Sequence, residues 1–263
     1  PLKISEDEKT ELMDILKEWE GQGFAELSET YLDEATLEAE RAGVLTVGSR
    51  ITSTGHVVPN YPKLLSLGLS GIIKQAEEQL EKRKSVARTH ESQSKIDFLD
   101  AVIITAKSAI KFAERFADEA EKLSSATSDP VRKKELQDMA DVCRYVPKNP
   151  PRSFHEALQF QWFIHLIMQI ETNGHSIGLG RFDQHMYEFY KKDIDEGKIT
   201  RDQAIELIQC MWIKMTELLK VRDSSEAEAF AGYPLWQNMA IGGQTPDGLD
   251  ATNELSYAIL DTY

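Results

Sequence analysis

The feature of this sequence that most constrains its fold is a helix pattern, from Phe154 to about Gln169, that is apolar on nearly all sides. Such a helix has to be buried, because it offers no polar face to water. It runs directly into residues 170–184, which place an acid, an amide, a histidine, a serine and an arginine around three glycines. Polar side chains on glycine-bent backbone at the end of a buried element are typical of a cavity wall. The sequence therefore predicts a pocket at this point.

The rest of the chain shows mostly helical periodicity, with capping signals at the expected boundaries. Ser5 and Glu8 form a capping-box pattern, Asp129 precedes a proline at a first helical position, and Ser153 with Glu156 forms a second box pattern. The expected helices are a first one that ends near residue 21, then 25–42, 63–123 with a break near 85–93, one from 130 to the prolines at 147–151, 154–169, 186–195, 200–222 and a last one capped by Asp250. Residues 44–61 are expected to be irregular and 235–241 to form a strand, so the chain is predicted to be mostly α-helical with a few short strands.

Charge and apolar content exclude several classes of partner. The net charge is −14, and the acidic residues are spread along helical faces, so neither a nucleic acid nor an anionic membrane surface is expected to bind. The longest apolar run carries His165 and two glutamines and is too short to span a bilayer. No signal-peptide pattern is visible, and Cys143 and Cys210 lie in apolar helical patterns, so we expect a cytoplasmic protein with two buried, reduced thiols.

His175 and Ser176 are the first candidates for binding a substrate. On a bent backbone, two adjacent polar side chains can line one pocket. The histidine can exchange a proton with a substrate hydroxyl near neutral pH, and the serine can both donate to and accept from a second hydroxyl. The alternative, a loop histidine bonded to backbone beside a serine in a turn, stays open on spacing alone.

His56 is the candidate catalytic acid or base. It lies between Gly55, which allows close approach of the backbone, and Pro59, which stiffens the segment that follows. A histidine held in this way can act in proton transfer. A histidine that only completes the hydrogen bonding of a loop is the alternative.

Three further charged residues stand near these candidates. Arg50 could bind an anionic substrate group through a bidentate contact, but its residue type and setting favour a structural pairing with one of the 44 acidic residues. Arg181 and Asp183 flank Phe182, and we expect them to pair with each other or to bond backbone and so brace the glycine segment.

Several common site types do not fit the sequence. Four histidines recur every ten residues, at 155, 165, 175 and 185, but at about 100° per residue this step does not gather ligands on one helix face, so no metal site is predicted. There is no G-x-S-x-G elbow for a serine hydrolase. Neither Gly178-x-Gly180 nor Gly242-Gly243 has the strand, loop and helix order of a phosphate cradle, and no bound cofactor is expected.

Several separated segments occur in the order found in one enzyme family: Trp-Glu-Gly at 19–21, Gly55-His56 with Pro-Asn-Tyr at 59–61, 154–163, 171–190, and Ile-Gly-Gly-Gln at 241–244. Together they resemble the glycyl radical enzymes of the pyruvate formate-lyase family, in particular the coenzyme-B12-independent glycerol (diol) dehydratase branch. The resemblance implies the fold class α/β, as part of a ten-stranded barrel that is helix-rich at this end. It also implies that residues 1–263 are part of a single pyruvate formate-lyase-type domain, truncated at both ends.

The resemblance also implies an activity. In this family a glycyl radical, installed by an S-adenosylmethionine [4Fe-4S] activase, abstracts hydrogen from a cysteine, and the thiyl radical then acts on a small-molecule substrate. The residue matching His56 protonates the departing hydroxyl, and the pair matching His175 and Ser176 binds the substrate hydroxyls. The full-length protein is expected to be a cytoplasmic homodimer that dehydrates a small diol or polyol.

The sequence departs from the family pattern in four places. The Gly-Cys-x-Glu cysteine loop and the C-terminal Arg-Val-x-Gly-Tyr radical loop are absent, so the 263 residues alone are expected to be inactive. Cys143 and Cys210 match neither loop. Ile177-Gly178 stands where the family often has Ile-Ser, and the segment before Gly55 differs from that of glycerol dehydratase, so the substrate stays open.

Other functions remain possible on these residues. If Arg50 faces the pocket, it could hold a sulfonate or carboxylate, which would suit C–S cleavage of an isethionate-like substrate, an arylacetate decarboxylase or a formate acetyltransferase. A non-catalytic helical scaffold is the alternative from a different class. It predicts that His56, His175 and Ser176 lie scattered on the surface.

Overall fold

The computed structural model describes residues 4–45, 55–84, 89–172, 174, 176–218, 220, 228 and 237–262. Over these residues the chain is mostly helical. The helices are α1 Glu6–Glu18, α2 Phe24–Glu29, α3 Glu34–Arg41, α4 Tyr61–Lys84, α5 His90–Ala126, α6 Pro130–Tyr145, α7 Phe154–Glu171, α8 Phe182–His185, α9 Tyr187–Asp195, α10 Arg201–Thr216 and α12 Glu254–Leu260. Two short strands accompany them, β1 Gly180–Arg181 and β2 Met239–Ala240.

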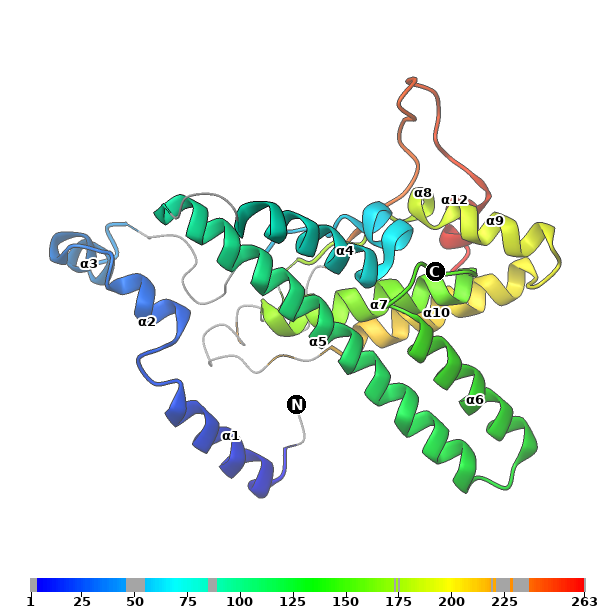
Figure 1. Ribbon diagram of the computed structural model, residues 1–263, viewed down its shortest axis with the longest axis horizontal. Coiled ribbons are helices and arrows are strands. Elements are labelled where there is room, and N and C mark those ends of the chain that lie inside the picture. Colours follow the sequence, from blue (N-terminus) through cyan, green and yellow to red (C-terminus); the bar gives the residue numbers. More distant parts are fainter. Residues whose placement is uncertain are drawn as a thin grey trace.

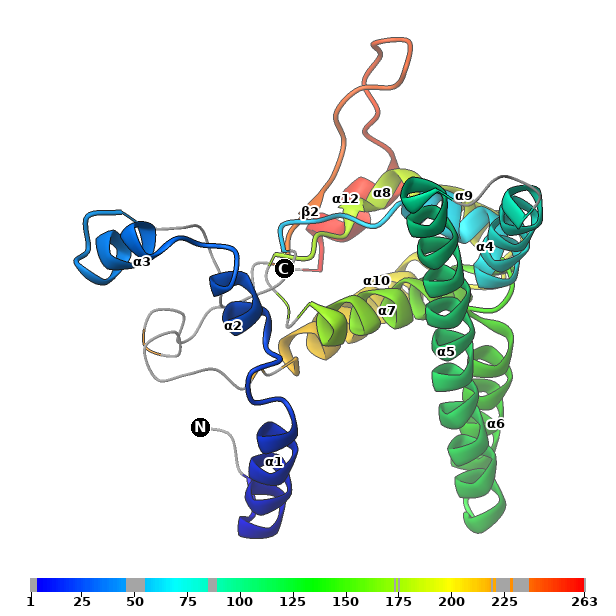
Figure 2. The same cartoon turned by 60° about the vertical axis from the view of Figure 1, so that its left-hand side comes forward.

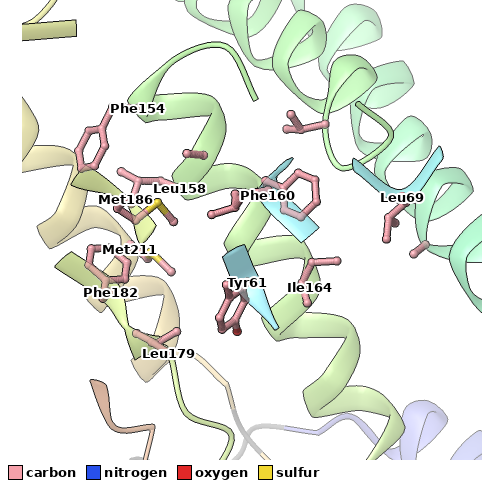
Figure 3. Close-up of a cluster of buried hydrophobic side chains, with 14 of the residues drawn as sticks. Tyr61, Leu69, Phe154, Leu158, Phe160, Ile164, Leu179, Phe182, Met186 and Met211 are labelled. Atoms are coloured by element: carbon pink, nitrogen blue, oxygen red, sulfur yellow. The ribbon is translucent and has the colours of Figure 1, made fainter. Parts of the chain in front are cut away.

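Helix α7 lies at the centre of the buried core, as its all-round apolar pattern predicts. Its side chains pack with those of α4, α8, α9, α10 and α12 in one cluster. Figure 3 shows aromatic, aliphatic and methionine side chains of this cluster converging, among them Tyr61 of α4, Phe160 of α7, Phe182 of α8 and Met211 of α10. This cluster fixes the position of the glycine segment that leaves the end of α7.

Helices α5 and α6 form a long antiparallel hairpin that projects from the core (Figure 2). The face that α5 buries is largely alanine at helical spacing: Ala106, Ala109, Ala113, Ala117 and Ala120. Small side chains let two helix backbones approach closely, so this pair needs few large apolar residues. The break predicted near residues 85–93 separates α4 from α5.

Helices α1, α2 and α3 contain no buried residue. Figure 1 shows them as an arm that leads away from the other helices. The capping box of Ser5 and Glu8 is confirmed at the start of α1. The single helix predicted over 25–42 is wrong, because Asp33 caps a new helix by accepting from the Thr36 N–H and so divides the segment into α2 and α3.

Three smaller predictions need correction. Asp250 does not cap the last helix; it accepts from the Thr252 N–H, and Asn253 caps α12. Ser153 does cap α7, but the Glu156 carboxylate bonds Arg152 instead of completing a capping box. The cysteines are not both buried, since Cys143 is half-buried and Cys210 is exposed on α10. Both thiols are free.

The two strands come from distant parts of the chain and pair in parallel. Gly180 lies opposite Met239, and Arg181 lies opposite Ala240. The predicted strand over 235–241 is therefore confirmed only for two of its described residues. No helix among the described residues has the length and apolar character needed to cross a membrane.

Candidate active site

A cavity of about 480 Å³ lies beside the two strands. Three segments far apart in the sequence line it: 56–58, 176–180 and 238–240. They bring His56 and Ser176 to the same cavity wall. Two of the side chains singled out from the sequence thus share one pocket, although 120 positions separate them.

The two glycines at 178 and 180 explain how the His56 segment reaches the pocket. The Gly178 N–H donates to the Val57 carbonyl at 2.9 Å. A Cβ at position 178 would lie 2.9 Å from Val58 Cγ2, and one at position 180 would lie 3.1 Å from Val58 Cγ1. The Gly-x-Gly pair therefore leaves room for the Val58 side chain, which brings the neighbouring His56 to the pocket.

Both candidate side chains sit on left-handed backbone, with φ of 53° at His56 and 55° at Ser176. This conformation costs a residue other than glycine on the order of 1–2 kcal/mol. Such positions persist where surrounding contacts impose them, and they occur often at functional sites. The left-handed backbone therefore points the His56 and Ser176 side chains in directions that helical or extended backbone would not allow.

The third lining segment of the pocket is β2 with the residue before it. The Leu179 N–H donates to the Asn238 carbonyl at 2.8 Å, which joins this segment to the glycine segment. Leu179 itself is fully buried in the core cluster. The pocket-lining segments 176–180 and 238–240 are therefore tied to the core through Leu179.

A polar network from α7 supports this wall. His165 Nε2 lies 2.6 Å from Gln237 Oε1, and Gln237 donates to the Met215 carbonyl at 3.1 Å. Gln169 lies one turn further along α7, 3.3 Å from His165. Burial lowers the pKa of His165, so this imidazole is neutral at neutral pH. Sequence analysis missed the network, although Gln161, His165 and Gln169 recur every four residues in an apolar helix, which marks one polar stripe.

Gln161, one turn earlier on α7, supports the glycine segment. Its amide donates to the Leu179 carbonyl at 3.2 Å, and its Oε1 lies 3.2 Å from His185 Nε2. Tyr61 stacks on the His185 ring at 5.4 Å between centroids. Burial lowers the pKa of His185 to about 4, so this imidazole is also neutral at neutral pH. We assign both histidines a structural part behind the pocket.

Arg181 and Asp183 bond backbone, as one of the two sequence-based alternatives predicted. Arg181 donates to the Gly242 carbonyl at 2.8 Å, and the Gly242 N–H donates to Asp183 at 2.6 Å. His175 and Arg50 lie outside the described residues. Among the residues that the structure does describe, no group of three His, Cys, Asp or Glu side chains could hold a metal ion.

Comparison with known proteins shows the family of this chain. The model of the pyruvate formate lyase-like family matches residues 1–263. The chain belongs to the pyruvate formate lyase-like family. This confirms the resemblance drawn from the sequence. It also confirms the predicted fold class: the family is one of barrel enzymes, and the portion described here is mostly helical with two short strands.

Three relatives illustrate the similarity. The isethionate sulfite-lyase of Oleidesulfovibrio alaskensis is 40% identical over 214 residues, which are 81% of this chain and 26% of the relative. The B12-independent glycerol dehydratase of Clostridium butyricum, solved with glycerol bound, matches with a TM-score of 0.90 and 43% identity over 99% of this chain and 33% of its own. A glycyl radical enzyme from Archaeoglobus fulgidus matches with a TM-score of 0.84 and 31% identity over 99% of this chain and 33% of its own. The chain thus spans between a quarter and a third of the length of these proteins.

Proposed function

We propose that this chain is the substrate-pocket portion of a glycyl radical lyase that dehydrates a small diol or polyol. The observation that carries the proposal is the shared cavity of His56 and Ser176, built by three distant segments on strained backbone. A scaffold would need no such convergence. A cavity of about 480 Å³ is also large enough for a molecule of a few carbon atoms.

In this proposal each polar side chain has a distinct part in the reaction. His56 is the general acid: its ring nitrogen gives a proton to the departing hydroxyl, which leaves as water. The Ser176 hydroxyl donates to one substrate hydroxyl and can accept from another, and His175 beside it holds the same group. The protein glycyl radical and the radical-forming cysteine belong to parts of the enzyme beyond this chain.

The proposal extends to the whole protein. The radical would be installed by an S-adenosylmethionine [4Fe-4S] activase, and the full-length protein would be a cytoplasmic homodimer acting on a small-molecule substrate. In the full-length protein, residues 1–263 would form part of one pyruvate formate-lyase-type domain that continues beyond both ends of this chain.

The second candidate function keeps the family and changes the bond. The similarity to isethionate sulfite-lyases favours it, because those relatives are named for a sulfonate substrate. Arg50 would then supply the charge that holds the anion. Substitution of Arg50 by Gln would abolish turnover of isethionate and leave turnover of a neutral diol unchanged.

The decisive experiment uses the full-length activated protein with glycerol, 1,2-propanediol and isethionate as substrates. His56→Gln is expected to lower kcat for diols by about 10²- to 10⁴-fold, because it removes the proton donor. Ser176→Ala is expected to raise KM by about tenfold, because it removes one hydrogen bond to a substrate hydroxyl. His90→Gln is the matched control, since His90 is an exposed histidine at the start of α5.

The outcomes separate the candidates. Turnover of isethionate but of neither glycerol nor 1,2-propanediol would replace the first proposal by the second. An activated wild-type protein that turns over none of the three would contradict both. Equal activity of His56→Gln and His90→Gln would remove His56 from the reaction.

A further inference from the structure

Strand β2 carries one wall of the pocket, yet its pairing with β1 is very short. The register consists of two residue pairs, Gly180 with Met239 and Arg181 with Ala240. Parallel pairs are less stable per residue than antiparallel ones, and an isolated pair of strands is marginal in water. Contacts outside this ladder therefore have to set where β2 stands.

The structure provides such contacts at the end of β2. The buried Asp183 accepts from the Gly242 N–H at 2.6 Å and from the Ser256 hydroxyl. Arg181 Nη2 donates to the Gly242 carbonyl at 2.8 Å and to the Gln244 carbonyl at 3.0 Å. Both backbone polar groups of Gly242 are thus bound by the two residues that flank Phe182.

The backbone conformation of residues 242 and 243 allows these hydrogen bonds to Arg181 and Asp183. Gly242 and Gly243 have φ of +64° and +89°, a region that other residues rarely adopt. A Cβ at position 243 would lie 3.2 Å from Arg181 Nη2, so a side chain there would press on the guanidinium. Phe182 is fully buried, and this fixes its two neighbours, Arg181 and Asp183, relative to the core.

We propose that Asp183 and Arg181 are positioning residues: by binding Gly242 they set where Asn238, Met239 and Ala240 stand in the pocket. At the other end of the span, Gln237 is bound by His165 of α7, so β2 is held at both ends by side chains. The expected effect of these residues on substrate turnover rests on the proposed function. Their expected effect on the position of β2 does not.

The chain offers a matched control for Asp183. Asp193 is also a buried aspartate, and its carboxylate accepts from the Phe154 N–H at 2.7 Å, at the start of α7. It lines no part of the pocket. Removing either carboxylate leaves a buried N–H without its acceptor, so the two changes share that cost in stability. Each also removes one further partner, the Ser256 hydroxyl at Asp183 and the Lys198 ammonium at Asp193.

The first test is amide exchange in the full-length protein, followed by mass spectrometry on peptides that cover residues 237–246. Asp183→Ala is expected to accelerate exchange there by about tenfold or more relative to Asp193→Ala, because only the former releases the Gly242 N–H. Asp183→Asn, which keeps an acceptor oxygen, is expected to restore most of the protection. Equal exchange in the two alanine variants would overturn the proposal.

Arg181→Ala keeps the test decisive if Asp183→Ala does not fold. Arg181 is exposed, so its removal should leave the unfolding temperature nearly unchanged while exchange at residues 242–246 rises. Unchanged exchange in this variant would also overturn the proposal.

The second readout uses the full-length activated enzyme. Displacement of a pocket wall by about 1 Å can cost about 10² in rate, so Asp183→Ala and Arg181→Ala are expected to lower kcat/KM by about tenfold to a hundredfold. Asp193→Ala is expected to lower the unfolding temperature without that loss. If the wild-type enzyme does not turn over diols, the proposed function fails, and the exchange comparison still decides the positioning role.

Discussion

The arm formed by α1–α3 and the body formed by α4–α12 are built from the same kind of sequence and reach different results. In the arm the large apolar side chains stay outside: Trp19 is 61% exposed and Tyr31 is 88% exposed. In the body, Tyr61 and Phe160 are fully buried. The arm's helices are nevertheless well capped, and α1 has a complete capping box.

The difference teaches that caps and periodicity specify helices, whereas burial specifies a fold. An isolated helix of about 12–15 residues is marginal in water, and α1 has 13. The body gains its stability from one shared cluster that joins seven helices: α4, α5, α7, α8, α9, α10 and α12. Among the described residues, nothing covers the apolar faces of the arm. We therefore expect substitutions in the two regions to differ sharply in cost.

The largest difference is expected between Phe160→Ala and Trp19→Ala. Phe160 is fully buried in α7, and its truncation should lower the free energy of unfolding by about 3–5 kcal/mol. Trp19 is the larger side chain, yet its truncation should cost no more than about 0.5 kcal/mol, because its surface is already exposed. Urea denaturation followed by circular dichroism measures both, and a similar cost for the two would mean that the arm is packed in solution.

A second comparison uses two glycines on left-handed backbone. A Cβ at Gly68 would lie 2.6 Å from the Lys148 carbonyl oxygen, whereas one at Gly21 would meet nothing within 4 Å. Gly68→Ala should cost about 3 kcal/mol, from backbone strain and overpacking together. Gly21→Ala should cost about 1 kcal/mol, confined to the arm. Thermal unfolding of the two variants tests this, and a larger shift for Gly21→Ala would contradict it.

A third comparison is pH dependence, since every histidine of the described residues lies outside the arm. Burial lowers the pKa of His185 from 6.5 to about 4. Between about pH 6.5 and pH 4 the unfolded chain binds this proton more readily than the folded chain does. The stability that neutral His185 contributes is therefore fully present above about pH 6.5 and is lost as the pH falls toward about 4. Between about pH 7 and pH 5 the contribution of His185 to this loss is about 2 kcal/mol.

Urea midpoints measured at the two pH values check this expectation. His185→Gln should flatten the dependence, and the control His90→Gln, at an exposed position, should leave it unchanged. An identical slope in both variants would show that His185 titrates alike in the folded and unfolded chain.

The candidate site could be predicted in part. Adjacent polar residues among glycines indicated a pocket wall at 174–180, and the loop composition around His56 marked a second irregular segment. That His56 and Ser176 line one cavity could not be predicted from spacing, because it depends on the Gly178 contacts with Val57 and Val58. The partners of Gly242 could not be predicted either, since Arg181 and Asp183 lie about 60 residues away from it in the sequence.

The sequence by itself determined which segments are helical and where most of them begin, because caps and apolar periodicity act over a few residues. It also determined, through its motifs, the family to which the chain belongs. Only the tertiary structure decided which of these helices are buried and which distant loops meet at the cavity. It also decided that β1 and β2, which pair through only two residues each, contribute to the lining of the pocket. The physical reason is that burial and the hydrogen bonds to Gly242 both depend on contacts between residues far apart in the chain. No local sequence pattern encodes such contacts.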